Sequence, residues 1–422
     1  MVTINFILER KVEWFKFTLL ALVAAYLASS AMMLKSADIF LYLLFIVSLL
    51  KVNVLREQLK NPIFRFFTIS LGAIFLLVLC STLVYLPVLS LFSYQFEVFR
   101  NLLLLPVIFS ALLSVKITQK EVILLVVLVG SYTFFYALAV FWQAPVRSSG
   151  LLTGVIQRGN LAVIYAILAL VFIYSSPYRW QKVVAFITFI SGIVLSMQTG
   201  SKGGWLALII SFSTLFILFS LYERRQLILL VFKVISLVVV LFLLWNFLPV
   251  QGRLESALKG LIGYFSHDGF IDGSVGARLE IWKATIIGIQ NFDLLTLLFG
   301  QGFMSFMAYF EQAQLAGVTR LSLLASHPHN DFLKIVFEFG LIGLLCFSAI
   351  FIYPMILFFK AFKEKHDFYH ALAGVLLIEM LLEFMLTDSA VFTKQLFYTY
   401  LFLIFLLLIS LKSTPQAQKS HE

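Results

Sequence analysis

Long apolar runs constrain the fold of this chain more than any other feature. Three examples lie at residues 17–34, 122–141 and 227–248, and each reaches the roughly 18 to 20 residues that a helix needs to cross a bilayer. The mean hydropathy is +1.00, and only 12% of the residues are charged. Such a composition cannot cover its apolar surface in water, so the sequence predicts an all-α polytopic membrane protein.

About twelve runs of this kind divide the chain. The expected membrane-spanning helices are residues 15–34, 38–54, 66–87, 98–115, 122–142, 160–176, 182–198, 203–221, 227–248, 332–359, 368–387 and 391–411. The corresponding organisation is helices 1 to 9 within residues 1–248, one large loop at 249–331, helices 10 to 12 within 332–411, and a cytoplasmic tail at 412–422.

The formal net charge of +10 follows from membrane topology and does not indicate nucleic-acid binding. Basic residues lie in short connections between the apolar runs instead of forming one face. With the N-terminus in the cytoplasm, every cytoplasmic connection carries at least two of them, as the positive-inside rule requires. They are Lys51, Arg56, Lys60, Arg65, Lys116, Lys120, Arg179, Lys182, Arg224, Arg225, Lys360, Lys363 and Lys365. An even number of spans also leaves the C-terminus in the cytoplasm.

The loop at residues 249–331 lies outside the cytoplasm under this topology. It contains amphipathic pieces, RLESALKGLIGYF at 253–265 and ARLEIWKATIIGI at 277–289. Long loops in compact proteins are usually functional or disordered, and the amphipathic pattern favours a folded helical cap on the membrane.

Basic residues on this outer face are informative, because topology does not require them there. They are Arg100, Arg147, Arg158, Lys202, Arg278 and Arg320. For each of them the alternative is a solvated or snorkelling side chain.

Arg278 is the most unusual of these residues. In GSVGARLEIW it falls in the expected first turn of a helix, after Asp272 or Ser274 as a candidate cap. A cation there opposes the helix dipole unless an anion offsets it, and a helix N-terminus with an arginine has the makings of a phosphate site. A salt bridge to Asp272 or Glu280 is the competing interpretation.

Lys202 lies in MQTGSKGGW, between the seventh and eighth expected helices. A glycine-rich turn could bring backbone N–H groups and the ammonium to an anion at membrane level. The spacing does not match a Walker motif. A plain tight turn is the alternative.

The segment SHPHNDF at residues 326–332 places two histidines, an asparagine and an aspartate within seven positions of an otherwise apolar chain. Pro328 suits the first turn of a helix, and Ser326 or Asn330 could cap it, so part of the segment has a purely structural explanation as the start of the tenth helix.

A helix cap does not explain the two histidines of this segment, however, because capping does not require an imidazole side chain. An unperturbed histidine has a pKa of about 6.5, so His329 could accept a proton near neutral pH. His327 and His329 could also bind zinc, but beyond Asp331 no third ligand is evident. The sequence therefore does not require a metal.

Three stretches together resemble the lipopolysaccharide O-antigen ligase family and its superfamily of O-antigen polymerases and protein O-oligosaccharyltransferases. They are TGSKGGWLAL at 199–208, GARLEIW at 276–282 followed by FGQGF at 299–303, and HPHNDFLKIVFEFGLIG at 327–343. The resemblance covers about half the chain, from the sixth helix onward, and the first five helices resemble the family only in hydropathy.

The resemblance implies an enzyme of the bacterial inner membrane. Members join a glycan carried on undecaprenyl diphosphate to an acceptor at the periplasmic face, without nucleotide, metal or other cofactor. By motif, His329 and Arg278 resemble the family's catalytic histidine and essential arginine. Lys202 departs from the family, which usually has arginine there, and lysine offers a point charge in place of a planar fork.

The sequence thus predicts an inverting O-antigen ligase that transfers glycan from undecaprenyl diphosphate to the lipid A core, with catalytic residues His329 and Arg278. The expected residues that bind the diphosphate and glycan are Lys202, Arg158, Arg320, His327 and Asn330. The alternatives are an O-antigen polymerase, whose acceptor is a second lipid-linked glycan, and a transporter of lipid-linked oligosaccharide, which needs no base.

Overall fold

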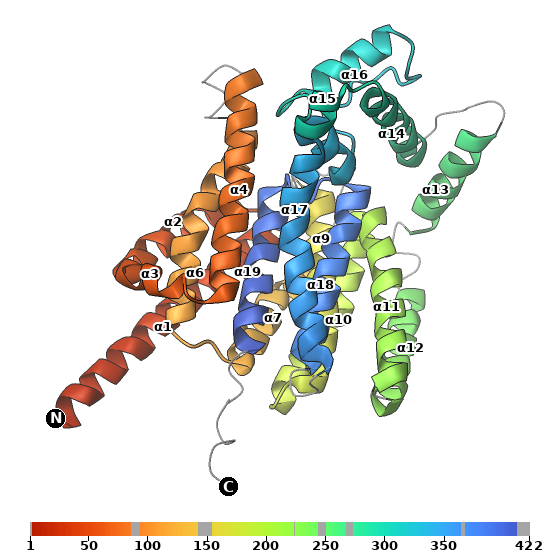
Figure 1. Cartoon of the computed structure of the whole chain (residues 1–422). Coiled ribbons are helices and arrows are strands. Elements are labelled where there is room, and N and C mark those ends of the chain that lie inside the picture. Colours follow the sequence, from red (N-terminus) through yellow and green to blue (C-terminus); the bar gives the residue numbers. More distant parts are fainter. Residues whose placement is uncertain are drawn as a thin grey trace.

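The computed structural model describes residues 2–85, 93–141, 154–222, 224–243, 250–266, 273–363 and 368–411. Every regular element in these ranges is a helix, and they contain no strand, which confirms the all-α prediction (Figure 1). The expected tail at 412–422, Arg147 and Asp272 lie outside the described residues.

Several of the helices expected in the first part of the chain are divided into shorter pieces, whereas α1 and α4 are continuous. Pro106 interrupts the expected helix at 98–115, because proline donates no hydrogen bond and favours a helix start. The next expected helix begins at a capping box between Thr118 and Glu121 and is interrupted at Ser131. The elements are α1 (Val2–Ala31), α2 (Ser36–Ser48), η1 (Leu49–Val54), α3 (Leu55–Gln58), α4 (Pro62–Tyr85), α5 (Tyr94–Arg100), η3 (Asn101–Leu104), α6 (Leu105–Ser114), α7 (Gln119–Gly130) and α8 (Tyr132–Phe141).

The second part of the chain supplies the centre of the bundle. Its long helices are α9 (Val155–Ser175), α10 (Arg179–Thr199), α11 (Lys202–Tyr222), α12 (Arg224–Leu243), α17 (Asp331–Lys363), α18 (Phe368–Thr387) and α19 (Lys394–Leu411). In α9, α18 and α19, between 78% and 89% of the membrane-spanning residues are buried, so these three helices lie at the centre of the bundle (Figure 1).

Eleven stretches of the described chain are long and apolar enough to cross a membrane. The chain is therefore a multi-pass membrane protein. The expected ninth span at 227–248 is present as α12 beside α11 but is not among the eleven. A total of twelve spans stays a prediction.

Four helices lie between α12 and α17, and three of them, α14, α15 and α16, lie together at one end of the bundle and are called the cap below (Figure 1). The four are α13 (Val250–Phe265), α14 (Gly273–Gln290), α15 (Leu294–Phe299) and α16 (Phe306–Leu315). A small hydrophobic core joins α14 and α16 to the start of α17 through Ile281, Ala284, Phe306, Phe310 and Phe337. Burying these side chains stabilises the cap on the bundle.

Two glycines attach the cap to α17 by direct backbone packing. Gly300 ends α15 at φ +80°, and Gly340 breaks α17 at φ +66° and ψ −164°, a conformation essentially restricted to glycine. A Cβ on Gly340 would lie 2.3 Å from the carbonyl carbon of Leu298. Backbone hydrogen bonds from Gln301 to Phe337 (2.8 Å) and from Gly302 to Glu338 (3.0 Å) complete this Gly300–Gly340 contact.

Candidate active site

A cavity of about 260 Å³ opens where the cap meets the bundle. It contains Lys202, Arg278 and His329, the three residues on which the sequence analysis relied most. The other lining residues are Ile156, Asn160, Gly200, Ser201, Gly203, Ser274, Ala277, Ile281, Thr387 and Asp388. We call this space the first cavity.

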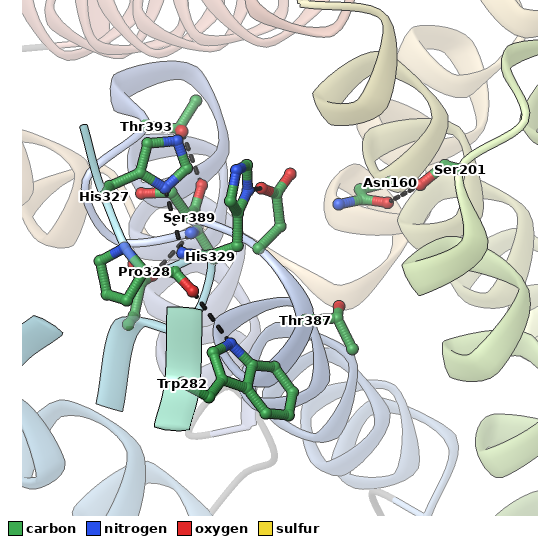
Figure 2. Close-up of polar contacts among 12 residues, drawn as sticks. Asn160, Ser201, Trp282, His327, Pro328, His329, Thr387, Ser389 and Thr393 are labelled. Carbon is green, nitrogen blue, oxygen red and sulfur yellow. Dashed lines mark hydrogen bonds and ion pairs between the residues drawn. The ribbon is translucent and has the colours of Figure 1, made fainter. Parts of the chain in front are cut away.

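The turn between α10 and α11 supplies one wall of the first cavity. Gly200 ends α10 in the left-handed region at φ +66°, and the Ser201 hydroxyl accepts the backbone N–H of Gly204 (3.3 Å) and donates to Asn160 Oδ1 (2.7 Å; Figure 2). Lys202 Nζ donates to the Ser274 hydroxyl across the cavity (3.3 Å). The predicted tight turn is therefore present, and it also brings the lysine and the N-terminus of α11 to the cavity.

Arg278 approaches from the opposite wall, on α14. It lies in the second turn of that helix, not in the first as predicted, and Ser274 lies within the helix instead of capping it. Among the described residues, no carboxylate comes within ion-pair distance of Arg278. Burial lowers the pKa of this guanidinium, and the negative charge of Asp388 opposes that effect only in part. A partly desolvated cation without an ion pair favours an anionic ligand.

Glu280, the alternative salt-bridge partner predicted for Arg278, bonds to other groups. Its carboxylate is buried and accepts hydrogen bonds from the Tyr264 hydroxyl (3.1 Å) and the Arg320 backbone N–H (3.0 Å), and it lies 3.8 Å from Lys283 Nζ. The predicted alternative of an Arg278–Glu280 salt bridge is therefore wrong.

His329 and Asp388 form the central pair of the site. His329 Nδ1 lies 3.1 Å from Asp388 Oδ1, and the two side chains are 33% and 6% exposed. Because a carboxylate only accepts, the hydrogen bond places the imidazole proton on Nδ1 and leaves the Nε2 lone pair for a ligand. Burial raises the pKa of Asp388, but the hydrogen bond from His329 and the charge of Arg278 outweigh it, so the pKa is lowered and the carboxylate stays ionised.

The backbone of His329 adopts φ +51°, a left-handed conformation that is uncommon outside glycine. Its neighbour Pro328 is fixed by a hydrogen bond from Trp282 Nε1 on α14 to the Pro328 carbonyl (2.9 Å; Figure 2). Because α17 begins at Asp331, Pro328 precedes the helix, and its predicted place in the first turn is wrong. Helix α14 therefore fixes the strained backbone of Pro328 and His329 from one side.

Asn330 and Asp331 hold the same segment from the other side. Asn330 Oδ1 accepts the backbone N–H of Leu333 (3.0 Å), which confirms Asn330 as the predicted N-cap residue of α17. Asp331 Oδ2 accepts the N–H groups of Ala390 (2.6 Å) and Val391 (2.8 Å), and so ties the start of α17 to the loop that carries Asp388. Neither residue lines the first cavity, and a role for Asn330 in substrate binding stays a prediction.

His327 stacks on His329, with ring centroids 3.9 Å apart, but does not line the first cavity. Its Nδ1 accepts the backbone N–H of His329 (3.2 Å). Burial, followed by the charge of His329, lowers the pKa of His327 to about 3, so the ring is neutral at pH 7. Among the described residues, no group of three or more His, Cys, Asp or Glu side chains is arranged to hold a metal ion.

Two predicted binding residues lie away from the first cavity. Arg158 is buried on α9 and donates to the Tyr136 hydroxyl and, at 2.7 Å, to the Met32 carbonyl. Arg320 has an exposed side chain on the cap, where its backbone contacts Glu280. Asp388, in contrast, was not predicted, because no motif marks the short TDSAVF connection after α18.

A family model described as O-antigen ligase matches residues 187–348, which include Lys202, Arg278 and His329. A Haemophilus influenzae protein described as uncharacterized is 23% identical over 283 residues, covering 66% of this chain and 64% of that protein. The matched region is thus less than two thirds of that relative's length. The family-model match confirms the resemblance seen in the sequence: residues 187–348 are similar to the O-antigen ligase family.

Proposed function

We propose that the chain is an inverting, metal-independent glycosyltransferase that moves O-antigen or a related glycan from undecaprenyl diphosphate to the lipid A core, at the periplasmic face of the inner membrane. The observation that carries this proposal is the convergence of Lys202, Arg278 and His329 on one cavity at the cap end of the bundle. The similarity of residues 187–348 to the O-antigen ligase family supports the same reaction class.

The basic wall of the first cavity suits the diphosphate. Lys202 and Arg278 approach from different helices, and the N-terminus of α11 adds backbone N–H groups. Diphosphate leaves readily once its developing charge is held by fixed donors. One preorganised donor of this kind is typically worth about 10² to 10³ in rate.

The His329–Asp388 pair suits the acceptor. Asp388 keeps the His329 proton on Nδ1, so Nε2 can take the proton of an acceptor hydroxyl as that oxygen attacks the anomeric carbon. The new C–O bond forms as the bond to the diphosphate oxygen breaks, and the diphosphate departs with the electron pair. A single displacement inverts the anomeric configuration. A positioned base contributes about 10² to 10⁴ in rate.

The residue assignments are tested by transfer assays on membranes that contain the full chain. His329→Ala should stop transfer while the protein remains inserted, and wild-type transfer by that variant would remove the base assignment. Lys202→Arg should retain activity and Lys202→Ala should lose most of it, if the side chain binds phosphate. Lys283→Ala serves as the matched control, because this lysine lies on α14, is 45% exposed and does not line the cavity.

The acceptor is tested by the glycolipids of cells that lack the chain. A bare lipid A core with long glycan stranded on undecaprenyl supports the ligase. Cores that carry a single repeat unit would identify the polymerase instead. A transporter should have its site at interrupted helices near the bilayer midplane. The interruption of α17 at Gly340 packs on α15 and does not line the first cavity, so it gives no support to transport.

A further inference from the structure

A second polar cavity of about 200 Å³ lies beside the His329 segment. Its lining includes Gln95, Gln157, His327, Ser389, Phe392 and Thr393, contributed by α5, α9 and the connections that flank α17 and α19. Figure 2 shows His327 beside Ser389 and Thr393, away from the Asn160–Ser201 pair of the first cavity. We call this space the second cavity.

The two cavities share the His327–Pro328–His329 segment as a partition. His329 lines the first cavity and His327 lines the second, although their rings are only 3.9 Å apart. On the other side, Asp388 lines the first cavity and the adjacent Ser389 lines the second. A ligand in the second cavity would therefore lie against residues one or two positions from both members of the His329–Asp388 pair.

The second cavity differs from the first in charge. Its cation, Lys334, is paired with the buried carboxylate of Glu338 at 2.9 Å and lies over the Phe392 ring. Arg278 of the first cavity has no such pair among the described residues. A compensated lysine adds little attraction for phosphate, so the second cavity favours an uncharged ligand.

His327 adds a defined donor. Because its Nδ1 accepts the backbone N–H of His329, the neutral ring carries its proton on Nε2. This Nε2–H can donate to a ligand oxygen but cannot act as a base. Two amides and several hydroxyls supply further donors and acceptors, with the Phe303 and Phe392 rings beside them. Amides, hydroxyls and apolar ring faces together suit a polyhydroxylated ring.

We propose that the second cavity binds the sugar of the acceptor glycan that carries the attacking hydroxyl. This assignment rests on the proposed glycosyl transfer and adds the place of the acceptor to it. The hydroxyl reaches the edge of the partition and gives its proton to His329 Nε2. Its oxygen then bonds to the anomeric carbon held in the first cavity, and the bond from that carbon to the diphosphate oxygen breaks.

The test uses the purified full chain in lipid vesicles and compares wild type with the double variant Gln95→Leu, Gln157→Leu. Initial rates are measured against acceptor concentration at saturating donor and against donor concentration at saturating acceptor. The acceptor KM should rise about tenfold, the effect expected from the loss of one or two ligand hydrogen bonds. The donor KM should stay within about twofold of wild type.

Lys202→Ala should show the reverse pattern, with a raised donor KM, and Lys283→Ala is the neutral control. A raised donor KM in the double variant, or an unchanged acceptor KM, would overturn the assignment of the second cavity. If the double variant folds poorly, the acceptor KM of the single variant Thr393→Val is measured in its place. An unchanged acceptor KM in Thr393→Val would also overturn the assignment.

Two acceptors distinguish the sources of the sugar. Lipid A–core and undecaprenyl-diphosphate-linked repeat units are assayed separately, and a raised KM for either one supports the second cavity as its binding site. Failure of the proposed function gives a different result. In that case neither acceptor is glycosylated by the wild-type chain, and undecaprenyl-diphosphate-linked glycan does not bind to it in a direct binding measurement.

Discussion

Replacement of Asp388 by asparagine is the sharpest probe of the site, because it changes one buried charge and almost no volume. Asp388 fixes the imidazole proton of His329 on Nδ1 through a hydrogen bond of 3.1 Å. In Asp388→Asn the side-chain amide can turn its NH₂ group toward Nδ1. That arrangement favours the other tautomer, with the proton on Nε2, and removes the lone pair that accepts the substrate proton.

The expected loss follows from this change of tautomer. A positioned base contributes about 10² to 10⁴ in rate, and the corresponding aspartate-to-asparagine change in serine proteases costs about 10⁴. We therefore expect kcat to fall about 10²- to 10⁴-fold, or about 2.7 to 5.4 kcal/mol. The donor KM should not rise, because loss of the Asp388 charge leaves Arg278 more attractive to a diphosphate.

The assay measures kcat and donor KM for purified protein in vesicles, with inserted protein quantified in each preparation. Glu255→Gln is the matched control, because it also removes one carboxylate charge but from an exposed pair with Lys259 on α13. A kcat within about fivefold of wild type, far below the contribution of a positioned base, would refute the orienting role of Asp388. A large rise in donor KM with unchanged kcat would likewise contradict it.

Three further outcomes are expected. Gly340→Ala should lower the melting temperature in detergent. The backbone conformation at this position costs a residue with a side chain about 1 to 3 kcal/mol, and the new methyl group would meet the backbone of Leu298. An unchanged melting temperature would contradict the Gly300–Gly340 contact. Trp282→Phe removes the hydrogen bond to the Pro328 carbonyl and should lower kcat at least about tenfold, and a wild-type kcat would show that His329 is held without it. The contribution of neutral His327 to the free energy of unfolding should be fully present above pH 6.5 and decrease toward pH 3, by up to about 1.4 kcal/mol per pH unit, because the unfolded chain protonates this histidine and burial prevents that in the folded chain. In His327→Gln the melting temperature should therefore depend less on pH over this range.

Hydropathy was sufficient to predict the helical class and most of the spans, because the bilayer requires long apolar helices. It missed the break at Pro106, which depends on local backbone chemistry, and the break at Gly340, which depends on contact with Leu298 and Phe299 of α15. The FGQGF and EFGLIG stretches also have a structural explanation. One glycine of each, Gly300 and Gly340, allows α15 to lie against the backbone of α17.

The site was only partly predictable for a similar reason. Lys202, Arg278 and His329 stand in polar motifs that interrupt apolar sequence, so they could be identified one by one. Which face of a helix a residue occupies depends on packing, and Arg158 turns toward Tyr136 and the α1 end instead of the cavity. The one available signal for Asp388 was a carboxylate directly after a predicted span, on the same membrane face as His329.

The Gly300–Gly340 contact also determines which parts of the site move together. It fixes α15 to α17, and the apolar core around Phe306 and Phe337 adds α14 to the same body, so Arg278 and His329 keep their relative positions. Lys202 belongs instead to the turn between α10 and α11. A diphosphate that contacts Lys202 and Arg278 at once would bridge these two bodies. Donor binding would then stabilise the whole chain and raise its melting temperature with the logarithm of donor concentration.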